Sequence, residues 1–303
     1  MTILTVPEPD AAIPVPIAGG GEILVRHYRC TGQARASLVL SHGNGFAIDA
    51  YAPFWAPLVA NFNLFVFDMR HHGRNTPTET FLTGFSTYAG DYDRIFPAVR
   101  EEAPDLPVIG ALHSVSAITA IFQASNNSEL PDGLVLFDPP LQPPAGHPNH
   151  PLAFDYEYKL ADWAQTRPRT FDSPDQLAAG FARSRSLSGW IDGAHDLMAR
   201  SILKNDGNDR WALRCPPEAE AANYLANAEL TTWDLLVDPP IPMAFISADP
   251  DHPAGQSPAK VCAAMHNEHG HPLISVPGTT HMLQIEQPET CRTALFQQVA
   301  RVI

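Results

Sequence analysis

The chain has 303 residues, a formal net charge of −14 and 19 basic residues that form no run. This charge balance provides none of the basic patches that bind nucleic acid or anionic membranes, so we expect neither as a partner. Hydrophobic residues make up 45% of the sequence and charged residues 17%, which indicates a globular chain with a large buried core.

The cysteines and the N-terminal segment bear on the cellular compartment. The four cysteines lie far apart in the sequence and lack the C-x-x-C spacing of metal or redox motifs, so we expect buried free thiols. The first ten residues, MTILTVPEPD, lack a basic start followed by an apolar run, and no apolar stretch approaches the roughly 18 residues of a membrane span. These features predict a cytoplasmic protein.

Short apolar runs alternate with longer amphipathic segments, which is the pattern of parallel strands joined by helices. Helices are expected between the strands, among them residues 51–62 and 87–102. The expected strands are residues 23–29, 37–41, 63–68, 106–112, 133–138, 241–247 and 272–276. The sequence therefore predicts an α/β fold with a mostly parallel central sheet flanked by helices.

The pattern changes after residue 138, where six prolines occur within 14 residues. Such a segment continues neither a helix nor a sheet. Residues 152–237 then contain helix starts but no good strand; one start is Ser173-Pro174, with serine at the N-cap and proline at the first helical position. We predict a helical cap, residues 141–240, inserted after the sixth strand of a core domain formed by residues 1–140 and 241–303.

A serine lies where a predicted strand runs directly into a predicted helix. Ser114 follows the strand at 106–112, and such a junction places the hydroxyl on a sharp turn at a helix N-terminus, where negative charge is stabilised. The surrounding sequence, LHSVSA, resembles the G-x-S-x-G nucleophile elbow of α/β-hydrolases, with Leu112 and Ser116 in place of the small flanking residues. The resemblance implies that Ser114 is the nucleophile, and Ser116 is a second candidate.

A serine nucleophile needs an imidazole base that is oriented by a carboxylate. His281 lies in VPGTTHMLQIEQPE, which closely resembles the histidine loop of the family. The family order is Ser, acid, His, and the segment IPMAFISADPDHP resembles its acid-bearing strand and turn, which implies that Asp251 is the acid. Asp249, in the same turn, is an alternative, and Asp138, at the end of the strand at 133–138, is another because some members of the family carry the acid there.

The segment SHGNGF, residues 41–46, follows the strand at 37–41 and resembles the oxyanion loop of the family. The resemblance implies an oxyanion hole formed by the backbone amides of Val115 and Asn44, with Gly45 as an alternative donor. The segment DMRHHGR, residues 68–74, resembles a second family turn in which Asp68 and Arg70 hold loops. We expect three residues to contact the substrate: Gly45, Phe46 and His113.

The resemblance spans about residues 38–140 and 241–303 and implies a serine hydrolase. We predict acyl-enzyme formation on Ser114 from a small to medium apolar carboxylic ester, with no metal and no organic cofactor. Lactone, thioester, amide and carbon–carbon hydrolysis use the same triad and stay open as alternatives. A second class of function is a non-catalytic small-molecule binder, suggested by Leu112 and Ser116 in the elbow.

Overall fold

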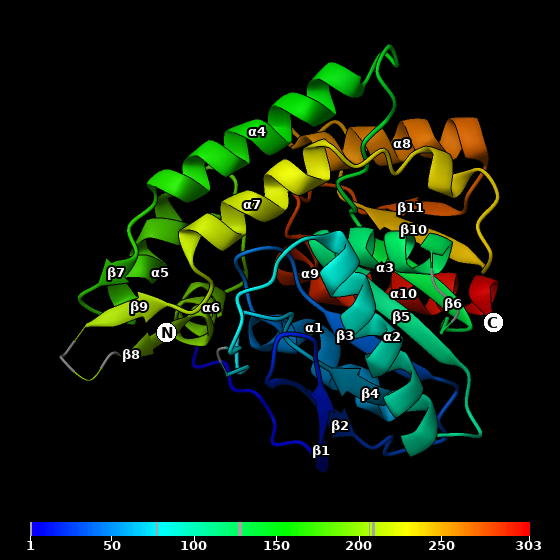
Figure 1. The fold of residues 1–303 in the computed structure, drawn as a ribbon, viewed down its shortest axis with the longest axis horizontal. Coiled ribbons are helices and arrows are strands. Elements are labelled where there is room, and N and C mark those ends of the chain that lie inside the picture. The colour runs from blue at the N-terminus through cyan, green and yellow to red at the C-terminus, as the bar shows by residue number, and fades with distance from the viewer. Residues whose placement is uncertain (1, 77, 127–128, 206, 208–209) are drawn as a thin grey trace.

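The computed structural model describes residues 2–76, 78–126, 129–205, 207 and 210–303. In this part of the chain an eight-stranded sheet has the order β1-β2-β4-β3-β5-β6-β10-β11 (Figure 1). Its strands are β1 (Ala11–Pro16), β2 (Glu22–Tyr28), β3 (Ser37–Ser41), β4 (Asn63–Val66), β5 (Val108–His113), β6 (Gly133–Phe137), β10 (Met243–Ser247) and β11 (Leu273–Ser275). Pairing is antiparallel from β1 to β4 and parallel from β4 to β11, which confirms the predicted mostly parallel sheet.

The sequence pattern missed β1, which pairs with β2 at one edge of the sheet. Pro14 and Pro16 lie in this strand, and proline normally argues against a strand because it lacks an N–H donor. An edge strand tolerates proline, since one side of its backbone needs no partner in the sheet.

Helices cover both faces of the sheet. One face shares a hydrophobic cluster with α2 (Phe85–Glu102), α3 (Val115–Asn126) and α8 (Ser257–His269), and the other with α1 (Ala52–Trp55), α9 (Leu283–Glu286) and α10 (Pro288–Val302). The helix expected at 51–62 is divided into η1 (Ile48–Tyr51), α1 and η2 (Ala56–Ala60), and Pro53 and Pro57 lie in its interior. Among the described residues, none of the helices has the length and apolar character required to cross a membrane.

The segment between β6 and β10 contains the predicted cap helices. They are α4 (His150–Thr166), α5 (Pro174–Arg183), α6 (Ala194–Ile202) and α7 (Pro217–Ala228), followed by the short η3 (Asp234–Leu236). The long helices α4 and α7 lie side by side (Figure 1) and pack through small residues, Ala161 and Ala164 against Ala221. Ser173 caps α5 by accepting a hydrogen bond from the amide of Gln176, as the sequence predicted.

The expectation of a cap without strands was wrong. β7 (Thr170–Phe171), β8 (Leu203–Asn205) and β9 (Trp211–Leu213) form a small antiparallel sheet. Strands of two or three residues are too short to produce an alternating hydrophobic pattern, so sequence periodicity does not reveal them.

Candidate active site

Ser114 lies in the one-residue turn between β5 and α3. Its φ of +58° is in the left-handed region that residues other than glycine rarely adopt. The Ser114 amide donates a hydrogen bond to the carbonyl of Phe137 in the neighbouring strand β6, at 3.0 Å, which holds the turn against the sheet. The hydroxyl therefore projects from a strained strand-to-helix turn at the N-terminus of α3, as the sequence predicted for a nucleophile elbow.

Leu112 and Ser116, which replace the small residues two positions before and after the serine of the family motif, have structural roles. The Ser116 hydroxyl donates to the His113 carbonyl at 2.7 Å and accepts from the His113 amide at 3.0 Å, and the residue is fully buried. Its hydroxyl therefore closes the turn, and Ser116, unlike Ser114, is not among the residues that line the cavity. Leu112 is also fully buried and belongs to the hydrophobic cluster beneath α2 and α3.

His281 joins Ser114 to a carboxylate. Its Nε2 lies 2.9 Å from Ser114 Oγ, and its Nδ1 lies 2.7 Å from Asp138 Oδ2. Because an ionised carboxylate only accepts hydrogen bonds, Nδ1 carries the proton and Nε2 is left to accept the proton of the serine hydroxyl. This is the geometry that general-base activation of a serine requires.

Asp138 follows directly on the last residue of β6. Its backbone has a φ of +42°, a conformation that aspartate tolerates better than most residues. The Asp138 amide donates to the Ile246 carbonyl at 2.7 Å, and its Oδ1 accepts the Ala248 amide at 3.0 Å. The buried carboxylate is thus fixed by the adjacent strand β10, with Oδ2 directed at His281.

The prediction that Asp251 orients the histidine is corrected to Asp138. Asp251 is exposed in the turn after β10, where its amide donates to Asp249 Oδ1 at 2.9 Å. Asp249 Oδ2 accepts the amide of Gly278, also at 2.9 Å, and these two backbone hydrogen bonds hold the pKa of Asp249 below its ordinary value. Asp249 therefore ties this turn to the loop that carries His281, and neither residue orients the imidazole.

His113 supports the loop that carries the base. Its Nε2–H donates to the His281 carbonyl at 2.9 Å, and its Nδ1 accepts from the Tyr51 hydroxyl, also at 2.9 Å. The Tyr51 oxygen accepts in turn from the Gly43 amide at 3.3 Å. Burial lowers the pKa of His113 well below its ordinary value, so the ring stays neutral and keeps this pattern. His113 lines the cavity and holds both the loop after β3 and His281.

The loop after β3 leaves one of its amides available to a substrate. The Gly43 amide donates to Tyr51, that of Gly45 to His72 Nε2 at 3.1 Å, and that of Phe46 to the Gly43 carbonyl at 3.2 Å. Among the hydrogen bonds of the described residues, none uses the amide of Asn44. This pattern favours Asn44 over Gly45 as the oxyanion donor of the loop.

Gly45 differs from its predicted role in substrate contact. Its φ is +73°, and a Cβ at this position would lie 2.3 Å from Glu220 Oε1. Gly45 is therefore pressed against helix α7 and is not among the residues that line the cavity, whereas Phe46 is. The glycine permits both the turn and the close approach of α7.

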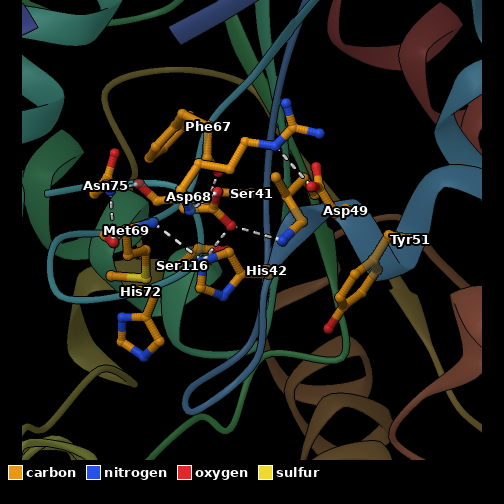
Figure 2. A network of polar contacts seen from close by, with 12 residues as sticks. Ser41, His42, Asp49, Tyr51, Phe67, Asp68, Met69, His72, Asn75 and Ser116 are labelled. Carbon is orange, nitrogen blue, oxygen red and sulfur yellow. Dashed lines mark hydrogen bonds and ion pairs between the residues drawn. The ribbon is translucent and has the colours of Figure 1, made fainter. Parts of the chain in front are cut away.

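A buried polar network joins His42, in the loop after β3, to the turn after β4 that contains Asp68 and Met69 (Figure 2). His42 Nδ1–H donates to the Gly43 carbonyl at 2.8 Å, and its Nε2 accepts the Met69 amide at 3.1 Å. Asp68 accepts the amide of Ile48 at 2.9 Å, which joins the two turns. Burial also lowers the pKa of His72 to about 3, so its Nε2 stays able to accept from the loop. The histidines of these turns, His42 and His72, therefore hold the loops.

A cavity of about 830 Å³ lies between Ser114 and His281 on one side and the segment between β6 and β10 on the other. Ser114, His281 and His113 lie on its wall together with Phe46 of the oxyanion loop. Most of the remaining wall is apolar and comes from the cap: Tyr156, Leu160, Trp163, Phe171, Leu177 and Phe181. A cavity of this size and character suits a small organic molecule.

Two charged residues of the cavity wall, Arg167 and Glu220, form an ion pair. Arg167 Nη1 lies 2.7 Å from Glu220 Oε2, and both side chains are buried. The Arg167 guanidinium also lies over the Trp163 ring, 4.8 Å from its centroid. This paired guanidinium and carboxylate carry no net charge when both are ionised. A second guanidinium of the wall, Arg183, is exposed and forms no ion pair within the described part of the chain.

Glu157 is a further ionisable residue on this wall, and it is almost completely buried in α4. Its Oε1 has no hydrogen-bond partner in the structure. Burial raises the pKa of Glu157 from 4.5 to about 8, against the opposing effect of Asn227. At neutral pH this side chain is therefore mainly an uncharged carboxylic acid.

This raised pKa predicts a pH-dependent stability. The folded state binds the Glu157 proton more tightly than the unfolded chain, so this stabilisation is complete below pH 4.5 and is lost as the pH rises toward about 8. Relative to Glu157→Gln, the free energy of unfolding of the unmodified protein should fall by up to about 1.4 kcal/mol per pH unit across this window. Denaturant unfolding of both proteins between these limits measures the difference, and parallel curves would contradict it.

Comparison with known proteins agrees with this architecture. The family model described as "Alpha/beta hydrolase family" matches residues 38–294. The chain therefore belongs to the alpha/beta hydrolase family, which confirms the predicted fold and the hydrolase class. It is similar to monoglyceride lipase of Homo sapiens, with 27% identity over 124 residues, and this match covers 40% of the chain and 41% of the relative. The match thus spans about two fifths of that relative's length.

Two solved structures share the fold across nearly the whole chain. The structure of E-2-(acetamidomethylene)succinate hydrolase has a TM-score of 0.74 and 18% identity, and covers 96% of this chain and 100% of its own. A malate-bound thermophilic esterase from Thermogutta terrifontis has a TM-score of 0.68 and 19% identity, and covers 96% of this chain and 99% of its own.

Proposed function

We propose that the protein is a serine hydrolase that cleaves carboxylic esters through an acyl-enzyme on Ser114. The observation that carries this proposal is the hydrogen-bonded series Ser114, His281 and Asp138, with distances of 2.9 and 2.7 Å, on the wall of a cavity. Family membership and the strained turn at Ser114 support it.

The reaction has two steps. Ser114 Oγ attacks the ester carbonyl while His281 Nε2 takes its proton, and Asp138 stabilises the imidazolium that forms. The backbone amides of Val115 and Asn44 donate to the carbonyl oxygen as it becomes negatively charged. The imidazolium then protonates the departing alcohol. Water, deprotonated by the same imidazole, releases the acid and regenerates the free serine.

The cavity favours an uncharged substrate of small to medium size. Its wall is mainly apolar, Arg167 is paired with Glu220, and Glu157 is mainly protonated at neutral pH. A carboxylate on the substrate would lose its hydration, and the lining cation that forms no ion pair among the described residues, Arg183, is exposed to solvent. This argument favours neutral esters over acids like those named for the two structural relatives.

Two measurements test the proposal. The wild-type protein should be labelled by a fluorophosphonate probe, and a folded but unlabelled protein would favour the non-catalytic binder. In a panel of p-nitrophenyl acyl esters, kcat/KM for butyrate should exceed that for the succinate half-ester by more than about tenfold, equivalent to about 1.4 kcal/mol. A preference for the half-ester would show that a guanidinium of the wall, Arg167 or Arg183, binds the substrate carboxylate. Turnover only of lactones, thioesters or amides would change the substrate class.

A further inference from the structure

The side chain of Asn44 is held by the cap. Its Nδ2 donates to the main-chain carbonyl of Glu220 at 2.8 Å, and its Oδ1 accepts from Asn223 Nδ2 at 2.9 Å. Asn44, Glu220 and Asn223 are each 2–3% exposed. Both partners lie in α7, so the residue that offers the free amide of the oxyanion loop has its whole side-chain amide bound to one helix of the cap.

The orientation of Asn223 is also fixed from the core. Tyr88, in α2, donates its hydroxyl proton to Asn223 Oδ1 at 2.5 Å. Burial raises the pKa of Tyr88 above its ordinary value, so the phenol keeps its proton at working pH. Because Tyr88 occupies the oxygen of the Asn223 amide, the nitrogen is directed at Asn44.

Helix α7 restrains the next residue of the loop as well. The Glu220 carboxylate lies against Gly45 and is fixed on its other side by Arg167. The two residues that follow the Gly43–Asn44 peptide bond, Asn44 and Gly45, therefore both contact α7. A backbone donor in an oxyanion hole is effective only when it is directed at the developing charge. Here His42 and the Phe46 amide hold the Gly43 carbonyl of the same peptide, and α7 holds its Asn44 side.

We propose that Asn223 is a positioning residue of the oxyanion hole, and that α7 completes the hole by orienting Asn44. This inference rests on the proposed serine hydrolase function. Asn223 is not among the residues that line the cavity, so it reaches the substrate only through Asn44. Its loss should therefore lower kcat more than it changes KM.

The test compares two buried asparagines of the same helix. Asn223→Ala removes the donor to Asn44, whereas the control Asn227→Ala, one turn later, removes a donor to the Pro140 carbonyl at 2.9 Å. Losing an oxyanion donor costs roughly 100- to 1,000-fold in kcat, so a misdirected donor should cost about 10- to 100-fold. Asn227→Ala should retain kcat, and KM should stay nearly constant in both variants.

A second readout separates positioning from general damage. A trifluoromethyl ketone forms a tetrahedral serine adduct with an oxyanion, whereas the carboxylic acid product does not. Asn223→Ala should weaken ketone inhibition by about the same factor as kcat and leave product inhibition unchanged. Equal losses of kcat in the two variants, or equal weakening of both inhibitors, would overturn the inference.

A milder substitution covers the case in which Asn223→Ala does not fold. Tyr88→Phe removes only the hydroxyl that fixes the Asn223 amide, so it should lower kcat and ketone affinity together, by less than Asn223→Ala. Unchanged values in Tyr88→Phe and in any folded Asn223 variant would reject the proposal. Failure of the wild-type protein to react with the fluorophosphonate probe would instead reject the hydrolase function itself.

Discussion

Replacing Ser114 by alanine should lower kcat for the best ester by roughly 10⁴- to 10⁶-fold and abolish fluorophosphonate labelling. The attacking oxygen is lost, while binding in the cavity and the oxyanion amides remain. Alanine at a φ of +58° is about as strained as serine, so the fold should be retained. Steady-state kinetics and labelling followed by intact mass measure the effect, and a thermal melt checks the fold.

Ser116→Ala is the matched control for this substitution. It removes the two hydrogen bonds to the His113 backbone and should cost about 1 to 3 kcal/mol of stability. It leaves the labelled oxygen in place, so probe labelling should persist. Labelling that survives Ser114→Ala and disappears in Ser116→Ala would reverse the assignment of the nucleophile.

Replacing Asp138 by asparagine should lower kcat by about 10⁴-fold. The oxygen of the new side-chain amide would still accept the Ala248 amide, but its nitrogen would favour the imidazole tautomer of His281 with the proton on Nε2. That tautomer cannot accept the Ser114 proton. The effect is measured by kcat at neutral pH, with a thermal melt to show that the fold is intact.

Asp251→Asn separates the two candidate acids. Asp251 contributes its main-chain amide to the turn after β10 and its side chain is exposed, so the substitution should leave kcat close to that of the wild type. Activity that survives Asp138→Asn and is lost in Asp251→Asn would contradict the geometry around His281.

Those parts of the site that depend on local sequence could be predicted. Ser114 and the oxyanion loop each follow directly on an apolar strand, and His281 lies in a characteristic loop, so the residues around them carry the signal. The choice between Asp138 and Asp251 depends instead on the strand order. Strand β6 lies next to β5, whereas β10 is one strand farther from Ser114. The sequence does contain one signal for this choice, which is the distance of each aspartate from the end of its strand. Asp138 follows β6 directly, whereas Asp251 lies beyond the end of β10.

The hydrogen bonds between α7 and Asn44 of the oxyanion loop could not be predicted from local sequence. Asn44 and Asn223 are 179 residues apart, and their contact requires the cap to fold back over the sheet. The sequence around a helical asparagine does not indicate a hydrogen-bond partner that is so distant along the chain. Gly45 was likewise predicted to contact the substrate, because the sequence does not show whether a helix or a ligand occupies the space beside a glycine.

The junction after β6 limits how freely the cap can be exchanged. Asp138 is followed by Pro139 and Pro140, where the cap segment begins. Near its end, α7 of this segment forms two hydrogen bonds with the Asn44 side chain. Replacing the whole cap by that of another protein would change the wall of the cavity. It would also remove the hydrogen bonds from α7 that hold Asn44. A chimera built to broaden the substrate range should therefore replace cap elements that precede α7 and retain α7 together with residues 138–140.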